Sequence, residues 1–227
     1  MSLVAASHPD DSVGPLDASI RRKVRLLVLL DAARLAGLTP LPAARLHIMA
    51  YLADVLSPVW DLDPYDGKVL KRPDGPFFPE LQHDLDRLVG SGMVAVEKVG
   101  HRSLGDDRLQ VNSSYTLNTA LAGNVLRHVS TLSDEHSSSA FMRELMLAMS
   151  AMTDEDIDRA FRQDATYSNK RIGPGNVIDF AEWSESNFSV SAADRIGELV
   201  PTEADVGPGE KVHLYFRHLQ RRLHGNR

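Results

Sequence analysis

The chain has 227 residues, of which 43% are hydrophobic and 25% are charged, so it can bury a sizeable core. Its formal net charge of -6 at pH 7 argues against a dedicated nucleic-acid binder, because such domains normally carry an excess of cations. It contains no cysteine, which excludes disulfides, thiolate metal sites and a cysteine nucleophile.

The N-terminal segment is polar and lacks the basic and apolar parts of a secretory signal, so we expect a disordered lead over residues 1–15. The most apolar run, residues 24–33, is interrupted by Arg25 and Asp31 and is too short to span a bilayer. We therefore expect a bacterial-type cytoplasmic protein without membrane contact.

Two helices are predicted at the start of a domain that covers residues 16–130. Asp17 is a plausible N-cap of the first helix, and apolar residues recur at helical spacing until Leu35, before Gly37 and Pro40. The second helix begins near Pro42 and carries apolar residues on one face: Leu46, Met49, Ala50, Ala53 and Leu56.

A loop and a third helix are predicted next. Prolines and glycines over residues 59–79 exclude a long regular element there, and the aromatic residues of this loop are expected to anchor it to the core. Pro79 suits the first turn of the third helix. An apolar stripe on that helix is expected to face inward: Leu81, Leu85, Leu88 and Val89.

Beyond Gly92, two segments that alternate apolar and polar residues predict a β-hairpin with a polar tip at residues 100–107. Helix, loop, helix and hairpin follow one another in the order of a winged helix-turn-helix. We therefore expect a mainly α fold, with a winged helix-turn-helix (α+β) N-terminal domain followed by a helical C-terminal region.

The C-terminal half is expected to comprise a helical region over residues 131–200, a linker over residues 201–209 and a basic helix over residues 210–227. A serine-rich link at residues 137–139 precedes a Met-rich stripe that suits both core packing and an adaptable binding surface. Thr153 resembles the N-cap of a further helix. Because a linker precedes the last helix, truncation after Pro208 is expected to leave a folded protein.

The segments RLLVLLDAA (residues 25–33) and PELQHDLDRLVGSGMV (residues 79–94) resemble small bacterial proteins of defence operons. These proteins are the middle components of ABC-three-component systems, encoded beside an SMC- or ABC-type ATPase and an effector. The resemblance covers about residues 20–117. It implies an adaptor between partner proteins and transfers no catalytic residue.

Three groups of polar residues are candidates for binding DNA or a protein partner. The third helix carries Gln82, His83 and Arg87. The hairpin carries Lys98, His101 and Arg102, and the loop before the third helix carries Lys68, Lys71 and Arg72. Asp84 and Asp86 argue against DNA, because carboxylates close to phosphates would repel them. The alternative interpretation of each group is a solvated charged surface.

The C-terminal helix supplies a fourth candidate group, Arg217, Arg221 and Arg222, with apolar residues between the cations. Such a helix can bind an acidic partner, nucleic acid or a membrane surface, or it can simply pack on the core.

No catalytic motif stands out. The His83-Asp84 pair lacks the further ligands of a metal-dependent phosphohydrolase, and no P-loop, HExxH or GxSxG pattern occurs. We therefore predict a protein that is not an enzyme and has no cofactor, with a nuclease or phosphohydrolase as a remote third class.

The favoured function is that of a non-catalytic winged-helix adaptor in a bacterial defence complex with the ATPase and effector as partners. The alternative is a winged-helix DNA-binding regulator, which would be a dimer because such regulators contact paired half-sites. Weak nucleic-acid binding and a homodimer are left open.

Overall fold

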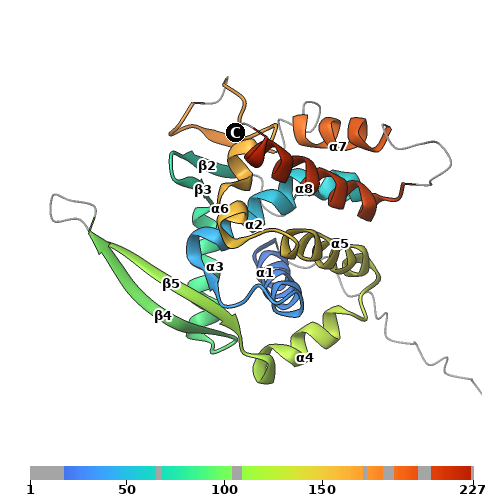
Figure 1. Ribbon diagram of the computed structural model, residues 1–227. Coiled ribbons are helices and arrows are strands. Elements are labelled where there is room, and N and C mark those ends of the chain that lie inside the picture. The colour runs from blue at the N-terminus through green and yellow to red at the C-terminus, as the bar shows by residue number, and fades with distance from the viewer. Residues whose placement is uncertain are drawn as a thin grey trace, which may run out of the picture.

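The computed structural model describes residues 18–64, 68–103, 109–170, 173–180, 187–198 and 206–225, and omits the side chains of residues 18, 102–111 and 134. The predicted lead over residues 1–15 lies outside these ranges. The helices are α1 (Ala18–Leu35), α2 (Ala43–Leu56), the short 3-10 helix η1 (Ser57–Trp60), α3 (Pro79–Gly90), α4 (Thr119–Val129), α5 (Ser133–Ser150), α6 (Asp154–Gln163), α7 (Phe188–Glu198) and α8 (Pro208–His224). The strands are β1 (Leu41–Pro42), β2 (Lys68–Arg72), β3 (Gly75–Phe77), β4 (Val94–Ser103), β5 (Leu109–Leu117) and β6 (Val177–Asp179). The chain is mainly helical (Figure 1).

The central helix is α2, in which every residue from Arg45 to Leu56 is buried. It lies against β1, β3, β5, α6 and α7. The sequence predicted one buried face for this helix, but in the structure the helix is buried on all sides. The reason is that apolar side chains occur all round its sequence LHIMAYLADVL, a pattern typical of a helix enclosed by other elements.

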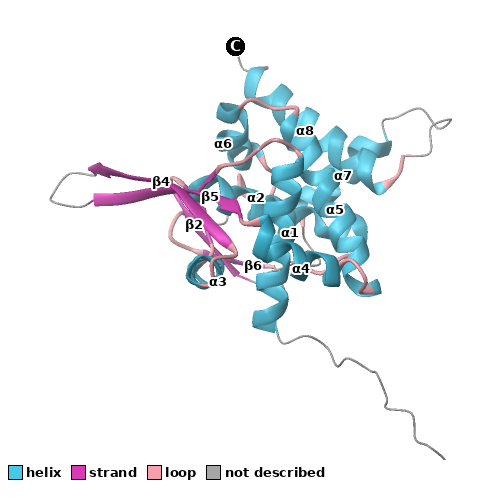
Figure 2. Cartoon of the chain, turned by 90° about the horizontal axis from the view of Figure 1, so that it is seen from below, coloured by secondary structure: helices cyan, strands magenta, loops and turns pink. Residues whose placement is uncertain are grey.

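The predicted hairpin is confirmed as β4 and β5, which pair from Val94 opposite Leu117 to Ser103 opposite Leu109. The predicted polar tip at residues 100–107 is wrong for residues 100–103, which belong to β4. The short strand β1 joins the other side of β5, which gives a three-stranded antiparallel sheet in the order β1-β5-β4. The outer part of the hairpin extends away from the helices in two perpendicular views (Figures 1 and 2). A β-bulge between Val96 and Lys98 adds one residue, Glu97, to β4.

The segment predicted as a loop at residues 59–79 contains a second small sheet. Strands β2 and β3 form a tight hairpin around Pro73 and Asp74, and β6 pairs with the other edge of β2. The prolines are compatible with this sheet because Pro76 lies on its outer strand, β3. The third strand, β6, comes from the C-terminal half of the chain.

The C-terminal half confirms some expectations and corrects others. Helices α4 and α6 lie where predicted, and the Thr153 hydroxyl accepts a hydrogen bond from the Asp156 backbone N–H at 3.2 Å as N-cap. The predicted serine-rich link at residues 137–139 is instead part of α5. The Met142 and Met146 side chains are 1% and 0% exposed, so the Met-rich stripe is core and not a binding surface.

Elements from both sides of residue 130 share one core. Helix α1 packs against α5, α2 against α6 and α7, and α8 against α5, α6 and α7. Arg45 of α2 bridges to Asp154 and Asp158 of α6, each at 2.8 Å. The predicted domain boundary at residue 130 therefore lies within one continuously packed core. Residues 201–205 of the predicted linker lie outside the described residues.

Helix α8 belongs to this core, since it buries Val212, Tyr215, Phe216 and Leu219. The expectation that the last helix is dispensable for folding is therefore not compatible with its packing. Within the described ranges, none of the helices combines the length and apolarity needed to cross a membrane.

Candidate interaction surfaces

Helix α3 exposes a mixed and partly acidic face. Its exposed side chains include Glu80, His83, Asp86 and Arg87, whereas Leu85 and Leu88 are buried as predicted. Pro79 at the first turn and Glu80 near the positive end of the helix dipole favour the start of the helix at this point. The face that a winged helix would turn toward DNA therefore carries as many carboxylates as basic side chains.

Asp84 does not belong to this exposed face, contrary to the expectation that it would repel phosphates. It is 1% exposed, and its Oδ2 accepts a hydrogen bond from Arg22 Nε of α1 at 2.9 Å. The same guanidinium lies 3.3 Å from Glu80, measured from Nη2 to Oε2. Asp84 therefore fixes α3 against α1, and the cation it needs comes from 62 residues away in the sequence.

Gln82, a predicted contact residue, is half-buried and already bound inside the protein. Its Nε2 donates to Asp86 Oδ1 at 2.9 Å, and its Oε1 lies 3.3 Å from His47 Nε2. The Phe78 backbone N–H donates to His47 Nδ1 at 3.3 Å, which leaves Nε2–H to donate to Gln82. Gln82 therefore joins α2 to α3 and is not free to contact a base edge.

His47 is a residue that the sequence reasoning missed. It is 3% exposed and lies beside the rings of Phe77 and Phe78. Burial lowers its pKa to about 4 and outweighs the opposing effect of the hydrogen bond that Nε2–H donates to Gln82, and the nearby Arg72 charge lowers the pKa further. His47 is therefore neutral at pH 7 and holds the start of α3 in place.

The basic group before α3 is largely engaged with the protein itself. Lys71 is 9% exposed, and its ammonium donates to the backbone oxygens of Tyr167 at 2.5 Å and Asn169 at 3.3 Å. The Arg72 guanidinium lies 3.7 Å from the centre of the Phe77 ring. Lys71 is therefore not available to a phosphate, because its ammonium group already donates to backbone carbonyl oxygens of the segment after α6.

Lys68 is the exposed member of that group, and its Nζ lies 3.3 Å from Asp179 Oδ2 on the paired strand β6. An exposed ion pair of this kind contributes little to stability. The structure therefore divides the three predicted cations between different environments and does not bring them together as one phosphate-binding surface.

The hairpin β4–β5 presents a mixture of cations and apolar side chains. Lys98 and His101 are exposed, whereas the Arg102 side chain lies outside the described residues. Val96 is 39% exposed and Val99 is 73% exposed on the same strand. The two valines add apolar area between the polar side chains of this strand, and such area suits contact with a protein better than contact with phosphates.

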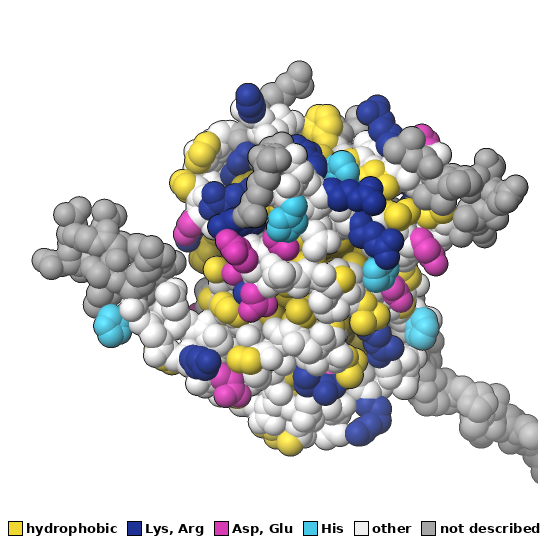
Figure 3. All heavy atoms as spheres, in the orientation of Figure 1, with side chains coloured by type: hydrophobic (Ala, Val, Ile, Leu, Met, Phe, Trp, Pro, Cys, Tyr) yellow, Lys and Arg dark blue, Asp and Glu magenta, His cyan; other side chains and the backbone are white. Residues whose placement is uncertain are grey.

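Helix α8 exposes its predicted cations outside the face that carries its buried residues. Arg217, Arg221 and Arg222 are exposed, and Arg222 Nη1 donates to the Gln163 backbone oxygen of α6 at 3.3 Å. Burial lowers the pKa of the neighbouring His218, and the charges of Arg222 and Arg221 lower it further. Lys and Arg side chains gather over this part of the molecule in the space-filling view (Figure 3).

A cluster of buried polar groups lies in the interior, around Asp164 at the end of α6. This carboxylate is 0% exposed and accepts hydrogen bonds from the hydroxyls of Tyr51 (2.5 Å), Ser189 (2.6 Å) and Tyr215 (2.7 Å). The backbone N–H groups of Thr166 and Tyr167 donate to it at 3.1 and 2.8 Å. These donors come from α2, α7, α8 and the turn after α6, so the cluster ties both halves of the chain together.

The same cluster shifts the tyrosine hydroxyls away from ionisation. Burial raises the pKa of Tyr51 and of Tyr215, and the negative charge of Asp164 raises both further. The two phenols therefore stay protonated and act as donors. Because Asp164 is fully enclosed by its donors, the cluster holds the fold together and offers no site to a substrate.

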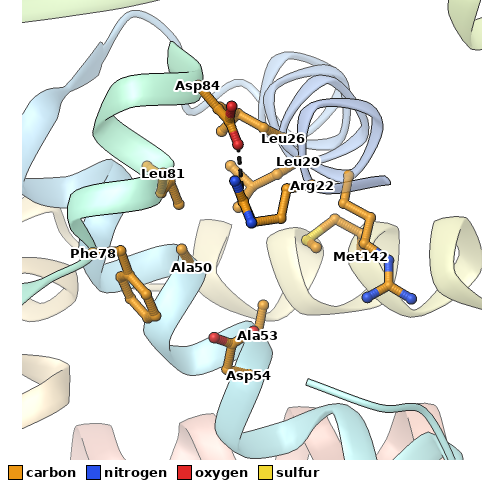
Figure 4. Close-up of a pocket in the computed structure, with 11 residues that line it drawn as sticks. Arg22, Leu26, Leu29, Ala50, Ala53, Asp54, Phe78, Leu81, Asp84 and Met142 are labelled. Atoms are coloured by element: carbon orange, nitrogen blue, oxygen red, sulfur yellow. Dashed lines mark hydrogen bonds and ion pairs between the residues drawn. The ribbon is translucent and has the colours of Figure 1, made fainter. Parts of the chain in front are cut away.

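A cavity of about 30 Å³ lies where α1, α2, α3 and α5 meet. Figure 4 shows Arg22 and Asp84 on one side of it and Asp54 on the other, among apolar side chains such as Leu29 and Phe78. Asp84 Oδ1 is buried and has no hydrogen-bond partner among the described residues. The cavity has room for ordered water but not for a substrate.

Within the part of the chain that the structure describes, no group of three or more His, Asp or Glu side chains is placed to hold a metal ion. Comparisons of the chain with protein-family models, with curated proteins and with solved structures found no match.

Proposed function

We propose that the chain is a non-catalytic adaptor, built around a winged helix-turn-helix core, that binds other proteins in the cytoplasm. The resemblance of residues 20–117 to the middle components of ABC-three-component systems makes an SMC- or ABC-type ATPase and an effector the proposed partners. Antiviral defence is the process that this pairing implies.

The order and pairing of elements support the winged-helix part of the proposal. Helix α1, strand β1, helices α2 and α3 and the hairpin β4–β5 follow one another, and β1 pairs with β5. In a winged helix, α3 would be the recognition helix and β4–β5 the wing. The β2–β3 hairpin between α2 and α3 replaces the short turn that links these helices in simple DNA-binding forms.

The composition of the α3 and β4 surface is the observation that carries the adaptor proposal. Glu80 and Asp86 accompany His83 and Arg87 on α3, and Val99 is the most exposed apolar side chain of β4. DNA affinity depends on several cations that contact phosphates together. A surface on which carboxylates are as frequent as basic side chains, with exposed valines beside them, fits a protein partner better.

Affinity isolation of the full-length chain from its native host, followed by mass spectrometry, tests the proposal. We expect an ATPase and an effector to co-purify with the wild-type chain. A double variant, His83→Glu with Arg87→Glu, should reduce their recovery because it replaces both basic side chains of the proposed contact surface of α3 with carboxylates. Both residues are exposed, so the fold should be unaffected. Arg143→Glu on the exposed side of α5 is the matched control. Recovery of the chain without other proteins would contradict the adaptor function.

A DNA-binding regulator is the second candidate, and the basic face of α8 is the observation that favours it. Arg217 and Arg221 are exposed there and have no ion-pair partner among the described residues. Binding of labelled duplex DNA, measured over a range of salt, separates the two functions. The adaptor predicts weak binding that disappears at physiological salt, whereas the regulator predicts tight binding that Arg87→Ala abolishes.

A further inference from the structure

Strand β4 forms one outer edge of the sheet β1-β5-β4 in the described part of the chain. All side chains from Ala95 to His101 are exposed, and Val99 is 73% exposed. The backbone N–H and C=O groups on such an edge can pair with another strand. A long outer strand with exposed valines is therefore suited to strand pairing.

The bulge at Glu97 gives this strand an unusual distribution of side chains. Val96 lies opposite Tyr115 and Val99 opposite Ser113, so the two valines share the face of the hairpin that bears Tyr115. Without the extra residue, positions three apart would lie on opposite faces. The bulge therefore aligns Val96 with Val99.

The opposite face carries a pair of opposite charges. Lys98 lies opposite Ser114, and the Glu97 carboxylate accepts a hydrogen bond from Thr116 Oγ1 at 2.7 Å. Ser114 and Thr116 are two positions apart on β5 and share a face. Glu97 and Lys98 are therefore adjacent on the face away from Tyr115.

We propose that β4 pairs antiparallel with β4 of a second copy of this chain, about a twofold axis between Glu97 and Lys98. Each Glu97 then lies opposite Lys98 of the other copy, and each Val96 lies opposite Val99 of the other copy. Residues opposite each other in an antiparallel pair share a face, and the bulge satisfies this condition for both pairs. The two sheets join into one with the strand order β1-β5-β4-β4-β5-β1.

The dimer is weak and concentration-dependent. Pairing of two short strand segments buries less area than a standard interface of about 1,600 Å². Cross-strand pairs of opposite charge or of β-branched residues each stabilise a sheet only slightly. We therefore expect a dimer that forms only at high protein concentration. The dimer does not depend on the adaptor function, since it is measured with the purified chain alone.

Sedimentation velocity of the full-length chain over two orders of magnitude in concentration tests the pairing. We expect a monomer that converts to a dimer as the concentration rises. Glu97→Lys and Lys98→Glu should each weaken the dimer at least tenfold, because each places like charges opposite each other. The double variant, Glu97→Lys with Lys98→Glu, restores the opposite-charge pairs and should recover dimerisation.

Arg143→Glu on α5 is the control, because it changes the net charge as Lys98→Glu does but lies outside the hairpin. Circular dichroism of each variant shows that the fold is retained. A wild-type chain that stays monomeric at every concentration would overturn the proposal. The proposal would also be overturned if the single substitutions left the dimer unaffected. It would equally be overturned if the double variant did not restore the dimer.

Discussion

The interior around Asp164 and the hairpin β4–β5 differ in how they use polar residues. At Asp164, hydroxyls from α2, α7 and α8 all point to one enclosed carboxylate. On the hairpin, Lys98 and His101 face solvent beside exposed valines. Polar residues in the first region fix the fold, whereas those in the second are available to a partner. Substitutions should therefore change stability in one region and association in the other.

Truncation after Pro208 should have the largest effect. It removes α8, whose Val212, Tyr215, Phe216 and Leu219 are buried, and it exposes the apolar surfaces of α5 and α6 that α8 covers. Loss of this helix costs several times the roughly 1.5–3 kcal/mol of one buried apolar side chain. Size-exclusion chromatography should show aggregates or an unfolded chain. A soluble, cooperatively melting fragment would show that α8 is an independent appendage.

Asp164→Asn should destabilise the fold more than a substitution on the hairpin. The amide nitrogen cannot accept hydrogen bonds, so the hydroxyls of Tyr51, Ser189 and Tyr215 compete for one oxygen. We expect a loss of about 3 kcal/mol, because buried donors lose their partners. Urea unfolding measures this loss. Asp86→Asn, at an exposed position on α3, is the control and should change stability by less than about 0.5 kcal/mol.

His47 should make the fold sensitive to acid. Its pKa is lowered to about 4 in the folded chain, against about 6.5 when unfolded, so the unfolded state binds the proton first as the pH falls. Its contribution to stability is fully present above pH 6.5 and is lost between about pH 6.5 and 4, by up to about 3 kcal/mol.

We propose to measure the free energy of unfolding at several pH values for the wild type and for His47→Asn. The difference between the two proteins separates the contribution of His47 from that of the carboxylates. Asparagine can still accept the Phe78 N–H bond but does not titrate. The difference between the two proteins should shrink as the pH falls. A difference that is constant with pH would mean that His47 titrates as it does in water.

Val99→Thr should have the smallest effect on the fold. The side chain is 73% exposed, so the exchange of a methyl for a hydroxyl removes little packing and keeps the β-branched shape. We expect a change within about 0.5 kcal/mol in urea unfolding at low protein concentration. A larger loss would mean that the hairpin packs against the helices more closely than its exposure indicates.

The sequence predicted the elements whose signals are local. Helix α3, the hairpin after Gly92 and the Thr153 N-cap follow from residues within a few positions of one another. The second sheet was missed because β6 pairs with β2 from about a hundred residues away. The prolines of the intervening segment also favour a loop.

The candidate surfaces were predicted less well than the fold, because burial of a charge depends on distant acceptors. Lys71 resembles an exposed cation in sequence, but its carbonyl acceptors lie 96 and 98 positions away. Asp164 has no local signal either, since its hydroxyl donors are 25, 51 and 113 positions away. Arg217 and Arg221, which the sequence offered as binding candidates, are exposed because their helix is amphipathic, and their binding role stays a prediction.

The most direct test of the central claim replaces Lys98, His101 and Arg102 together with alanine. The partner complex from the host and the salt dependence of DNA binding are then measured on the same preparation. We expect the complex to lose its protein partners while DNA binding stays at its weak baseline. A steep loss of DNA binding, with a salt slope reduced by about two charges and the partner complex intact, would contradict the adaptor function.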